Sequence, residues 1–195
     1  METSTLGIYK LLKKSNAKFV DYVYLSRLLD VTNRNTLYKI TNKLIDENVL
    51  TKLSKGKFVV QDAIVTDFEV ANYLYKPSYI SLESALSFYG ILSQFTYTIS
   101  SVSTKKSKNI SFRGKSYRYS QLKNDFFLGY EKHNNFLIAT KEKALFDSIY
   151  FCSKGLINLD FSELDFSDVN IGLLREIIFK TKDKALISFF EKIIL

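Results

Sequence analysis

Six polar side chains between positions 34 and 43 share one face of a predicted helix. The apolar residues Leu37, Ile40 and Leu44 recur at helical spacing and mark the buried face. The opposite face carries Arg34, Asn35, Tyr38, Lys39, Asn42 and Lys43. Arginine can pair with guanine and asparagine with adenine, whereas lysine and tyrosine suit phosphate oxygens. A solvated face of any basic protein has a similar composition, but the position of this helix in the chain favours nucleic-acid recognition.

A second group of cations lies in a predicted hairpin just after this helix. Two short strand-like runs, residues 49–53 and 57–60, are separated by Gly56, which can adopt a positive φ. The hairpin carries Lys52, Lys55 and Lys57, none of which has an acidic neighbour in the sequence. We expect these lysines to contact phosphate, and the alternative is an ordinary solvated turn.

A third basic cluster occurs between Ser100 and Ser120, where six cations and no acidic residue alternate with aromatic residues. The cations are Lys105, Lys106, Lys108, Arg113, Lys115 and Arg118. Such a cluster is typical of a second nucleic-acid surface or of a site for an acidic partner. The interpretation that we favour is a solvated sheet face whose aromatic residues point into the core.

Residues suited to catalysis are scarce. The chain has one histidine and one cysteine; His133 lies in a polar loop, and Cys152 ends an apolar helix, where we expect it to pack. We expect Glu83, Glu142 and Asp147 to be helix caps or surface charges. The seven glycines form no phosphate-binding loop. The sequence therefore predicts a protein that is not an enzyme and that has no catalytic residues, metal or cofactor.

The elements that position the first two groups follow a recognisable order. A helix runs from about Ser4 to Lys14, and a short helix follows Asp21 as its N-cap. Thr32 or Asn33 caps the third helix, and Asn48 ends it in a left-handed conformation. Helix, helix, turn, helix and hairpin is the order of a winged helix-turn-helix, whose third helix enters the major groove.

The remainder of the chain has a different pattern. Ser81 is expected to cap a helix that ends at Gly90, and residues 95–140 alternate with period two, which indicates an antiparallel sheet of about four or five strands, one of them within residues 125–130. Thr140 caps a helix to about Ser153, and further helices end the chain. The predicted class is α+β, with residues 1–62 as a winged helix-turn-helix, 63–77 as a linker that contains some helix, and 78–195 as a C-terminal domain of an antiparallel sheet packed with helices.

Charge supports a nucleic-acid partner for the first segment. The net charge of the chain is +8, and residues 1–62 hold eleven basic and six acidic residues. The first fifteen residues lack the features of a signal peptide, and no apolar run is long enough for a membrane span. We therefore expect a cytoplasmic protein without a membrane partner.

Several motifs of the chain resemble the AbiEi family of antitoxins. The segment 77–90 is followed by a β meander and then by 138–147, and the N-terminal segment also fits through residues 36–39, Leu44, 49–50 and 55–58. The resemblance covers most of the chain up to about Phe151. It implies an autorepressor that binds its own promoter through the winged helix, at an inverted repeat if two copies bind together.

The resemblance further implies the antitoxin of a type IV toxin-antitoxin system, which acts in abortive infection as a phage defence. Its C-terminal domain would counter a nucleotidyltransferase-like toxin, with or without direct contact. Two other functions remain open from the residues alone. One is a transcription regulator whose C-terminal sheet binds a small ligand or a protein, and the other is a protein-interaction module that uses the winged helix for contacts.

Overall fold

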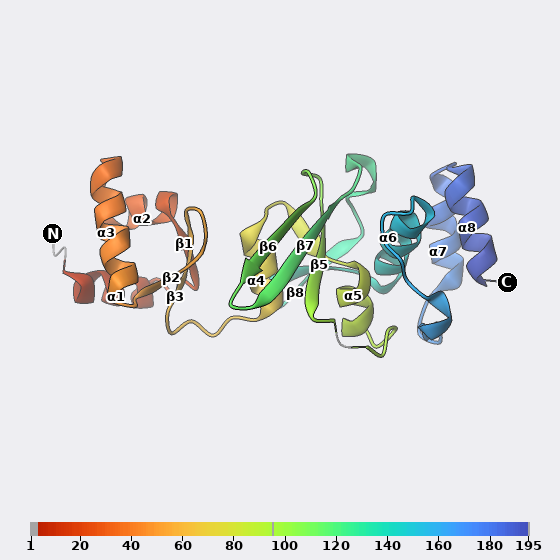
Figure 1. Cartoon of the computed structure of the whole chain (residues 1–195), viewed down its shortest axis with the longest axis horizontal. Helices are drawn as coiled ribbons and strands as arrows, with labels where there is room; N and C mark the ends of the chain where they lie inside the picture. Colours follow the sequence, from red (N-terminus) through yellow and green to blue (C-terminus); the bar gives the residue numbers. More distant parts are fainter. Residues whose placement is uncertain (1–3, 95, 195) are drawn as a thin grey trace. The chain divides into compact units, whose positions relative to one another are not determined.

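The chain is α+β and divides into two compact units, residues 1–66 and 67–195. The computed structural model describes residues 4–94 and 96–194, and Figure 1 labels their helices and strands. None of the helices in these residues has the length and apolar character that crossing a bilayer requires.

The first unit combines three helices with a three-stranded antiparallel sheet. The helices are α1 (Thr5–Lys14), α2 (Tyr22–Leu29) and α3 (Arg34–Asp46), and the strands are β1 (Phe19–Asp21), β2 (Leu50–Ser54) and β3 (Lys57–Val60), in the order β1-β3-β2. Strand β1 was not predicted, since three residues are too few to show an alternating pattern.

Local side chains define the ends of these helices. The Asp21 and Asn33 carboxylate and amide oxygens accept hydrogen bonds from the backbone N–H of Tyr24 and Thr36, at 2.7 and 3.0 Å, so the predicted caps are confirmed. Asn48 has φ 57° and Gly56 has φ 74°, which confirms the left-handed residue after α3 and the glycine turn of the hairpin. Leu12, Leu25, Leu44 and Phe58 are among the buried residues that form the core of this unit.

The second unit is built on a six-stranded sheet in the order β6-β7-β5-β4-β9-β8. The strands are β4 (Ser78–Ile80), β5 (Thr98–Ser103), β6 (Lys108–Phe112), β7 (Lys115–Gln121), β8 (Tyr130–His133) and β9 (Phe136–Ala139). Strand β4 is parallel to β9, and β5 is parallel to β7. The sheet is therefore mixed, and the prediction of an antiparallel sheet is wrong because parallel neighbours are joined by crossovers that leave no local signal.

The strand predicted within residues 125–130 is also not formed. The 3-10 turn η1 (Asn124–Phe126) occupies this segment, and only Tyr130 belongs to a strand. Phe126 packs against Phe146 and Tyr150, whereas Phe127 packs against Tyr79 and Tyr130. The two adjacent aromatic residues thus anchor a turn on different neighbours instead of alternating across a sheet.

Helices cover both faces of this sheet. On β7, the Tyr117 and Tyr119 hydroxyls donate hydrogen bonds to α4 (Asp67–Leu74), whereas Arg118 between them reaches α5 (Leu82–Phe88). Because successive side chains of a strand point to opposite faces, α4 and α5 lie on different sides. Helix α6 (Lys141–Ser153) packs against α5, and it also contacts α7 (Ile171–Lys180) and α8 (Lys184–Ile194), which gather beside it in Figure 1.

Helix α4 falls within the segment that was expected to be a linker, residues 63–77. Its residues Val70, Ala71 and Leu74 are buried, and the Tyr119 hydroxyl donates to the Ala71 carbonyl at 2.7 Å. The helix therefore belongs to the second unit, and the unit boundary falls between positions 66 and 67. Some helix was expected in this segment, but a periodic pattern of eight residues was too short to assign the helix to the second unit.

Candidate nucleic-acid interface

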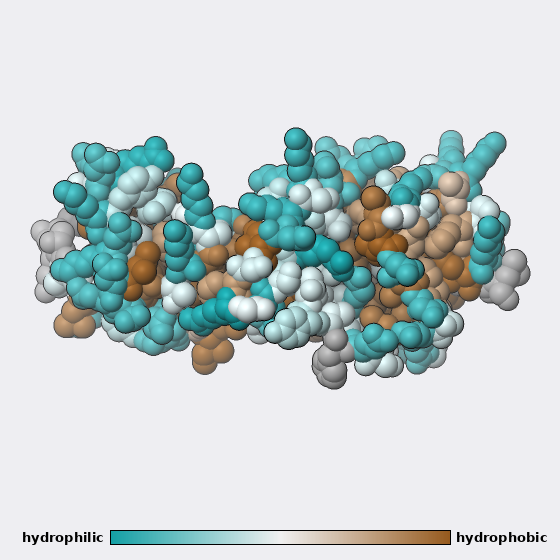
Figure 2. Space-filling view, viewed as in Figure 1, coloured by the Kyte–Doolittle hydropathy of each residue, from teal (hydrophilic) through white to brown (hydrophobic). Residues whose placement is uncertain are grey.

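Helix α3 has a buried face and an exposed face that is rich in hydrogen-bond donors. Leu37, Thr41 and Leu44 are buried, and the Thr41 hydroxyl is bonded to the Leu37 carbonyl at 2.7 Å. The predicted residues Arg34, Asn35, Lys39, Asn42 and Lys43 are exposed, and Thr36 and Asp46 are the other exposed residues of the helix. Hydrophilic side chains cover most of the area over α3 in Figure 2. The predicted residues thus lie together along one side of a helix that the core holds in place.

Tyr38 differs from the other predicted residues because it is half-buried. Its ring packs edge-on against Tyr22 at a centroid distance of 4.8 Å, and its hydroxyl accepts a hydrogen bond from Arg34 Nε at 2.6 Å. The Arg34 guanidinium also lies 5.4 Å from the centre of the Tyr38 ring. Tyr38 therefore orients Arg34 at the start of α3, and its hydroxyl is already engaged.

Tyr22 connects this arrangement to the hairpin, and sequence reasoning did not identify it. Its ring packs against Phe58 of β3 at 5.4 Å, and a Cβ added at Gly56 would lie 3.3 Å from it. Burial, followed by the neighbouring Tyr38, raises the pKa of Tyr22. One neutral ring thus fixes α3 relative to the hairpin turn. Only the fold brings these residues together, so no sequence pattern could have found this contact.

The hairpin lysines have different surroundings. Lys52 and Lys55 are exposed, and Lys55 lies in the turn between β2 and β3. Lys57 is half-buried and lies directly opposite Asp21 of β1 in the sheet register. Lys57 therefore has an acidic neighbour in the folded chain, although it has none nearby in the sequence. On α3, Lys43 is paired with Glu47 at 3.8 Å, an exposed contact that contributes little.

The basic cluster of the second unit splits into two parts. Lys115 is paired with Asp67, and Arg118 donates to Glu83 at 3.0 Å and to the Ser100 hydroxyl at 3.1 Å. Glu83 is therefore the counter-ion of Arg118. These two cations are neutralised by side chains 48 and 35 positions away in the sequence.

The other four cations of this cluster lie near the outer strand β6. Lys105 and Lys108 place their ammonium groups 5.7 and 5.6 Å from the centre of the Tyr75 ring. The Tyr75 hydroxyl donates to the Lys106 carbonyl at 2.9 Å, and Arg113 lies over Phe112 in the β6–β7 turn. Lys105, Lys106, Lys108 and Arg113 are exposed, so this part of the cluster carries its charge into solvent.

Asp147 is completely buried, so the expectation that it is a cap or a surface charge is wrong. Its carboxylate accepts hydrogen bonds from the Tyr79 hydroxyl at 3.0 Å and the Ser81 hydroxyl at 2.7 Å, and it is paired with Lys143. Ser81 thus uses its side chain to bind Asp147 and makes no side-chain cap to α5. Burial raises the pKa of Asp147 and lowers the pKa of Lys143.

The side chains of Tyr79, Ser81, Lys143 and Asp147 satisfy one another's hydrogen-bonding groups and join β4 to α6. This cluster is therefore structural in character. The other carboxylate of α6, Glu142, accepts from the Asn170 backbone N–H at 3.1 Å, just before α7. Glu142 therefore connects α6 to the start of α7.

His133 is exposed and ends strand β8, so the prediction that it lies in a loop is wrong, and Cys152 is half-buried near the end of α6. The His133 ring lies 5.1 Å from that of Phe88 and 5.4 Å from that of Phe136. Burial raises the pKa of Cys152 to about 11, so its thiol is protonated at neutral pH. Within residues 4–94 and 96–194, no three His, Cys, Asp or Glu side chains are grouped so that they could hold a metal ion.

Comparison with known proteins assigns no family to this geometry. The chain matches none of the protein-family models and none of the curated proteins. Function therefore has to be inferred from the arrangement of the side chains and from the motifs described above.

Proposed function

We propose that the first unit is a winged helix-turn-helix that binds double-stranded DNA, with α3 in the major groove and the β2–β3 hairpin as the wing. The observation that carries this proposal is the exposed face of α3, where Arg34, Asn35, Lys39, Asn42 and Lys43 lie together. An α-helix fits the major groove, and these side-chain types suit base edges and phosphates.

The two parts of this surface have different tasks. Arg34 and Asn35, in the first turn of α3, read base edges, since in this class of motif the N-terminal residues of the recognition helix do so. Lys52 and Lys55 of the hairpin hold the phosphate backbone. The contacts of Tyr22 with Tyr38 and Phe58 support this division, because they keep the helix and the hairpin in a fixed relation.

The target that we propose is the promoter of the protein's own operon, where the protein acts as a repressor. The motif resemblance of residues 77–90 and 138–147 supports a further role as the antitoxin of a type IV system, which counters a nucleotidyltransferase-like toxin. In this proposal the second unit has no catalytic task. A ligand-controlled regulator is the second candidate, and a cavity in the second unit, lined by residues of α4, β4 and the β8–β9 hairpin, favours it.

Mobility shifts test the DNA-binding proposal directly. The full chain is titrated against a fragment of its own upstream region and against a scrambled fragment of the same length and composition. We expect the upstream fragment to bind more tightly by at least about 10³-fold at physiological salt. Equal affinity for the two fragments would refute specific autoregulation, and the absence of binding to either would refute the DNA-binding assignment itself.

A further inference from the structure

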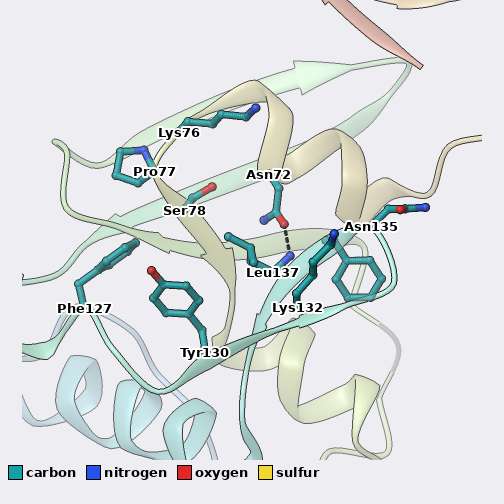
Figure 3. A pocket seen from close by; sticks show the side chains of 10 residues that line it. Asn72, Lys76, Pro77, Ser78, Phe127, Tyr130, Lys132, Asn135 and Leu137 are labelled. Atoms are coloured by element: carbon teal, nitrogen blue, oxygen red, sulfur yellow. Dashed lines mark hydrogen bonds between the residues drawn. The ribbon is translucent and has the colours of Figure 1, made fainter. Parts of the chain in front are cut away.

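The second unit contains a cavity of about 530 Å³ beside α4 and the start of β4 (Figure 3). It is lined by α4, by the start of β4, by the β8–β9 hairpin and by the segment before β8. Asn72, Lys76, Ser78, Phe127, Tyr130 and Lys132 are the lining residues that matter here. The volume lies within the range of small-molecule binding sites.

Two polar groups in this cavity, the Ser78 hydroxyl and the Asn72 side-chain NH2, have no hydrogen-bond partner among the described residues. Ser78 is only 3% exposed, and its hydroxyl makes no hydrogen bond. The Asn72 side-chain oxygen accepts from the Leu137 backbone N–H, which leaves the buried Nδ2 group without an acceptor. Figure 3 shows that Asn72 and Ser78 face the same space from α4 and β4. A buried donor without an acceptor is costly, so both groups call for an acceptor inside the cavity.

The charge of the cavity favours an anion as that acceptor. Lys76 and Lys132 lie at its border, and both are exposed. No aspartate or glutamate belongs to the described residues that line it. Two cations and two unpaired donors around one space complement a carboxylate or phosphate group.

The remaining wall is aromatic. The Phe127 and Tyr130 rings lie 5.3 Å apart, and Tyr130 is stacked on the buried Tyr79 at 4.7 Å with an interplanar angle of 14°. The Tyr130 ring is therefore held in one orientation by a residue of the core. Flat rings of this kind favour a planar ring in the ligand.

We propose that this cavity binds a small organic anion that carries a planar ring. Lys76, Lys132 and the Ser78 hydroxyl bind the anionic group, the Asn72 amide donates to an acceptor beside it, and the ring lies against Phe127 and Tyr130. The site lies entirely within the second unit and does not depend on the DNA-binding proposal.

Calorimetric titration of the full chain tests the site with four probes. AMP and 4-hydroxybenzoate each combine a ring with an anion, and they distinguish a phosphate from a carboxylate source. Inorganic phosphate supplies only the anionic group, and adenosine supplies only the planar ring. We expect at least one of the first two to bind, and each half-probe to bind at least about tenfold more weakly. Binding of none of the probes, or equal binding by phosphate alone, would overturn the proposal.

Three variants connect the binding to the cavity. Ser78→Ala and Lys132→Gln should each weaken the probe that binds by about tenfold, since each removes a contact to its anionic group. Lys123→Gln, an exposed lysine that lines a different depression, is the matched control and should leave the affinity unchanged. Ser78→Ala should not lower the melting temperature of the free protein, because the hydroxyl has no partner to lose. Unchanged affinity in both cavity variants would show that the probe binds elsewhere.

Discussion

Arg34 and Lys55 illustrate how neighbouring contacts decide what one cation can do. Arg34 is held by the Tyr38 hydroxyl at 2.6 Å, and Tyr38 in turn packs against Tyr22. Lys55 lies exposed in a turn. A fixed guanidinium suits the directional hydrogen bonds of a base edge, whereas a mobile ammonium suits a phosphate at any sequence.

This contrast predicts different effects of two substitutions on DNA binding. Arg34→Ala should cost about 1–3 kcal/mol on the preferred site and relax the sequence preference, while Lys55→Ala should weaken all sequences alike and reduce the salt slope by about 0.9. Fluorescence anisotropy at several salt concentrations measures both quantities. Loss of preference in Lys55→Ala but not in Arg34→Ala would reverse the two assignments.

The buried pair of Lys143 and Asp147 leads to a prediction about stability. Lys143→Met leaves a buried carboxylate without its counter-charge and should lower the free energy of unfolding by about 3–5 kcal/mol. Adding Asp147→Asn removes that charge and keeps an acceptor for Tyr79 and Ser81, so the double variant should be more stable than Lys143→Met alone. Urea unfolding followed by circular dichroism provides the values.

The matched control for this pair is Lys141→Met, two residues earlier on the same helix. Lys141 is paired at 3.5 Å with Asp168, which is 82% exposed. An exposed pair of this kind contributes less than about 1 kcal/mol, so the control should differ little from the wild type. An equal decrease in the free energy of unfolding for Lys141→Met and Lys143→Met would show that the buried pair stabilises the fold no more than the exposed one.

Among the helices, α8 depends on a single carboxylate at its start. Asp183 accepts from the Lys154 ammonium at 2.6 Å and from the backbone N–H of Ala185 and Leu186 at 3.1 and 3.2 Å. The Lys154 hydrogen bond, followed by that from Leu186, holds the pKa of Asp183 below its ordinary value. This residue therefore connects the end of α6 to the start of α8.

The lowered pKa determines the direction of a pH effect. Because the folded state favours the ionised carboxyl group, the stabilisation is complete above the pKa of the unfolded chain, about 4, and is lost as the pH falls through the lower folded value. Asp183→Asn should therefore unfold at a lower temperature than the wild type at pH 7, and the difference should shrink below about pH 4. Glu191→Gln, an exposed change on the same helix, should show no such dependence; an equal pH dependence in both variants would contradict the assignment.

The elements that could be predicted are those with local signals. Asp21 and Asn33 cap their helices through residues three positions away, and Asn48 and Gly56 adopt the conformations that their residue types favour. The parallel pairing of Ile80 with Ile138 has no such signal, because the residues are far apart in the chain. The same reason explains why the exposed face of α3 could be predicted, whereas the counter-ions Asp67 and Glu83 and the contact of Tyr22 could not.

At the scale of the whole chain, the position of the unit boundary predicts which fragment folds. Residues 67–195 include α4, whose buried side chains Val70, Ala71 and Leu74 contribute several kcal/mol, at about 1.5–3 kcal/mol for a large apolar residue. A fragment that starts at Ser78 lacks this helix and leaves Tyr119 without its acceptor. We expect the longer fragment to unfold cooperatively and the shorter one to lose the cooperative transition.

Circular dichroism during thermal unfolding distinguishes the two fragments, and the antitoxin proposal adds a second measurement. If the antitoxin proposal holds, the longer fragment should protect cells from the cognate toxin without residues 1–66. Equal stability of the two fragments would show that α4 is dispensable. A folded longer fragment that gives no protection would refute the division of labour and leave the fold assignment intact.

The sheet of the second unit is open at both ends, since β6 and β8 are its outer strands. Outer strands can pair with another molecule, and lysine at the edge is a common protection. Lys105, Lys106, Lys108 and Arg113 surround β6, so two copies that approach through this edge repel each other. This repulsion is screened as the Debye length falls from about 10 Å at 0.1 M salt to about 3 Å at 1 M. Colloidal stability should therefore decrease with rising ionic strength, and we expect light scattering to detect self-association first in concentrated salt.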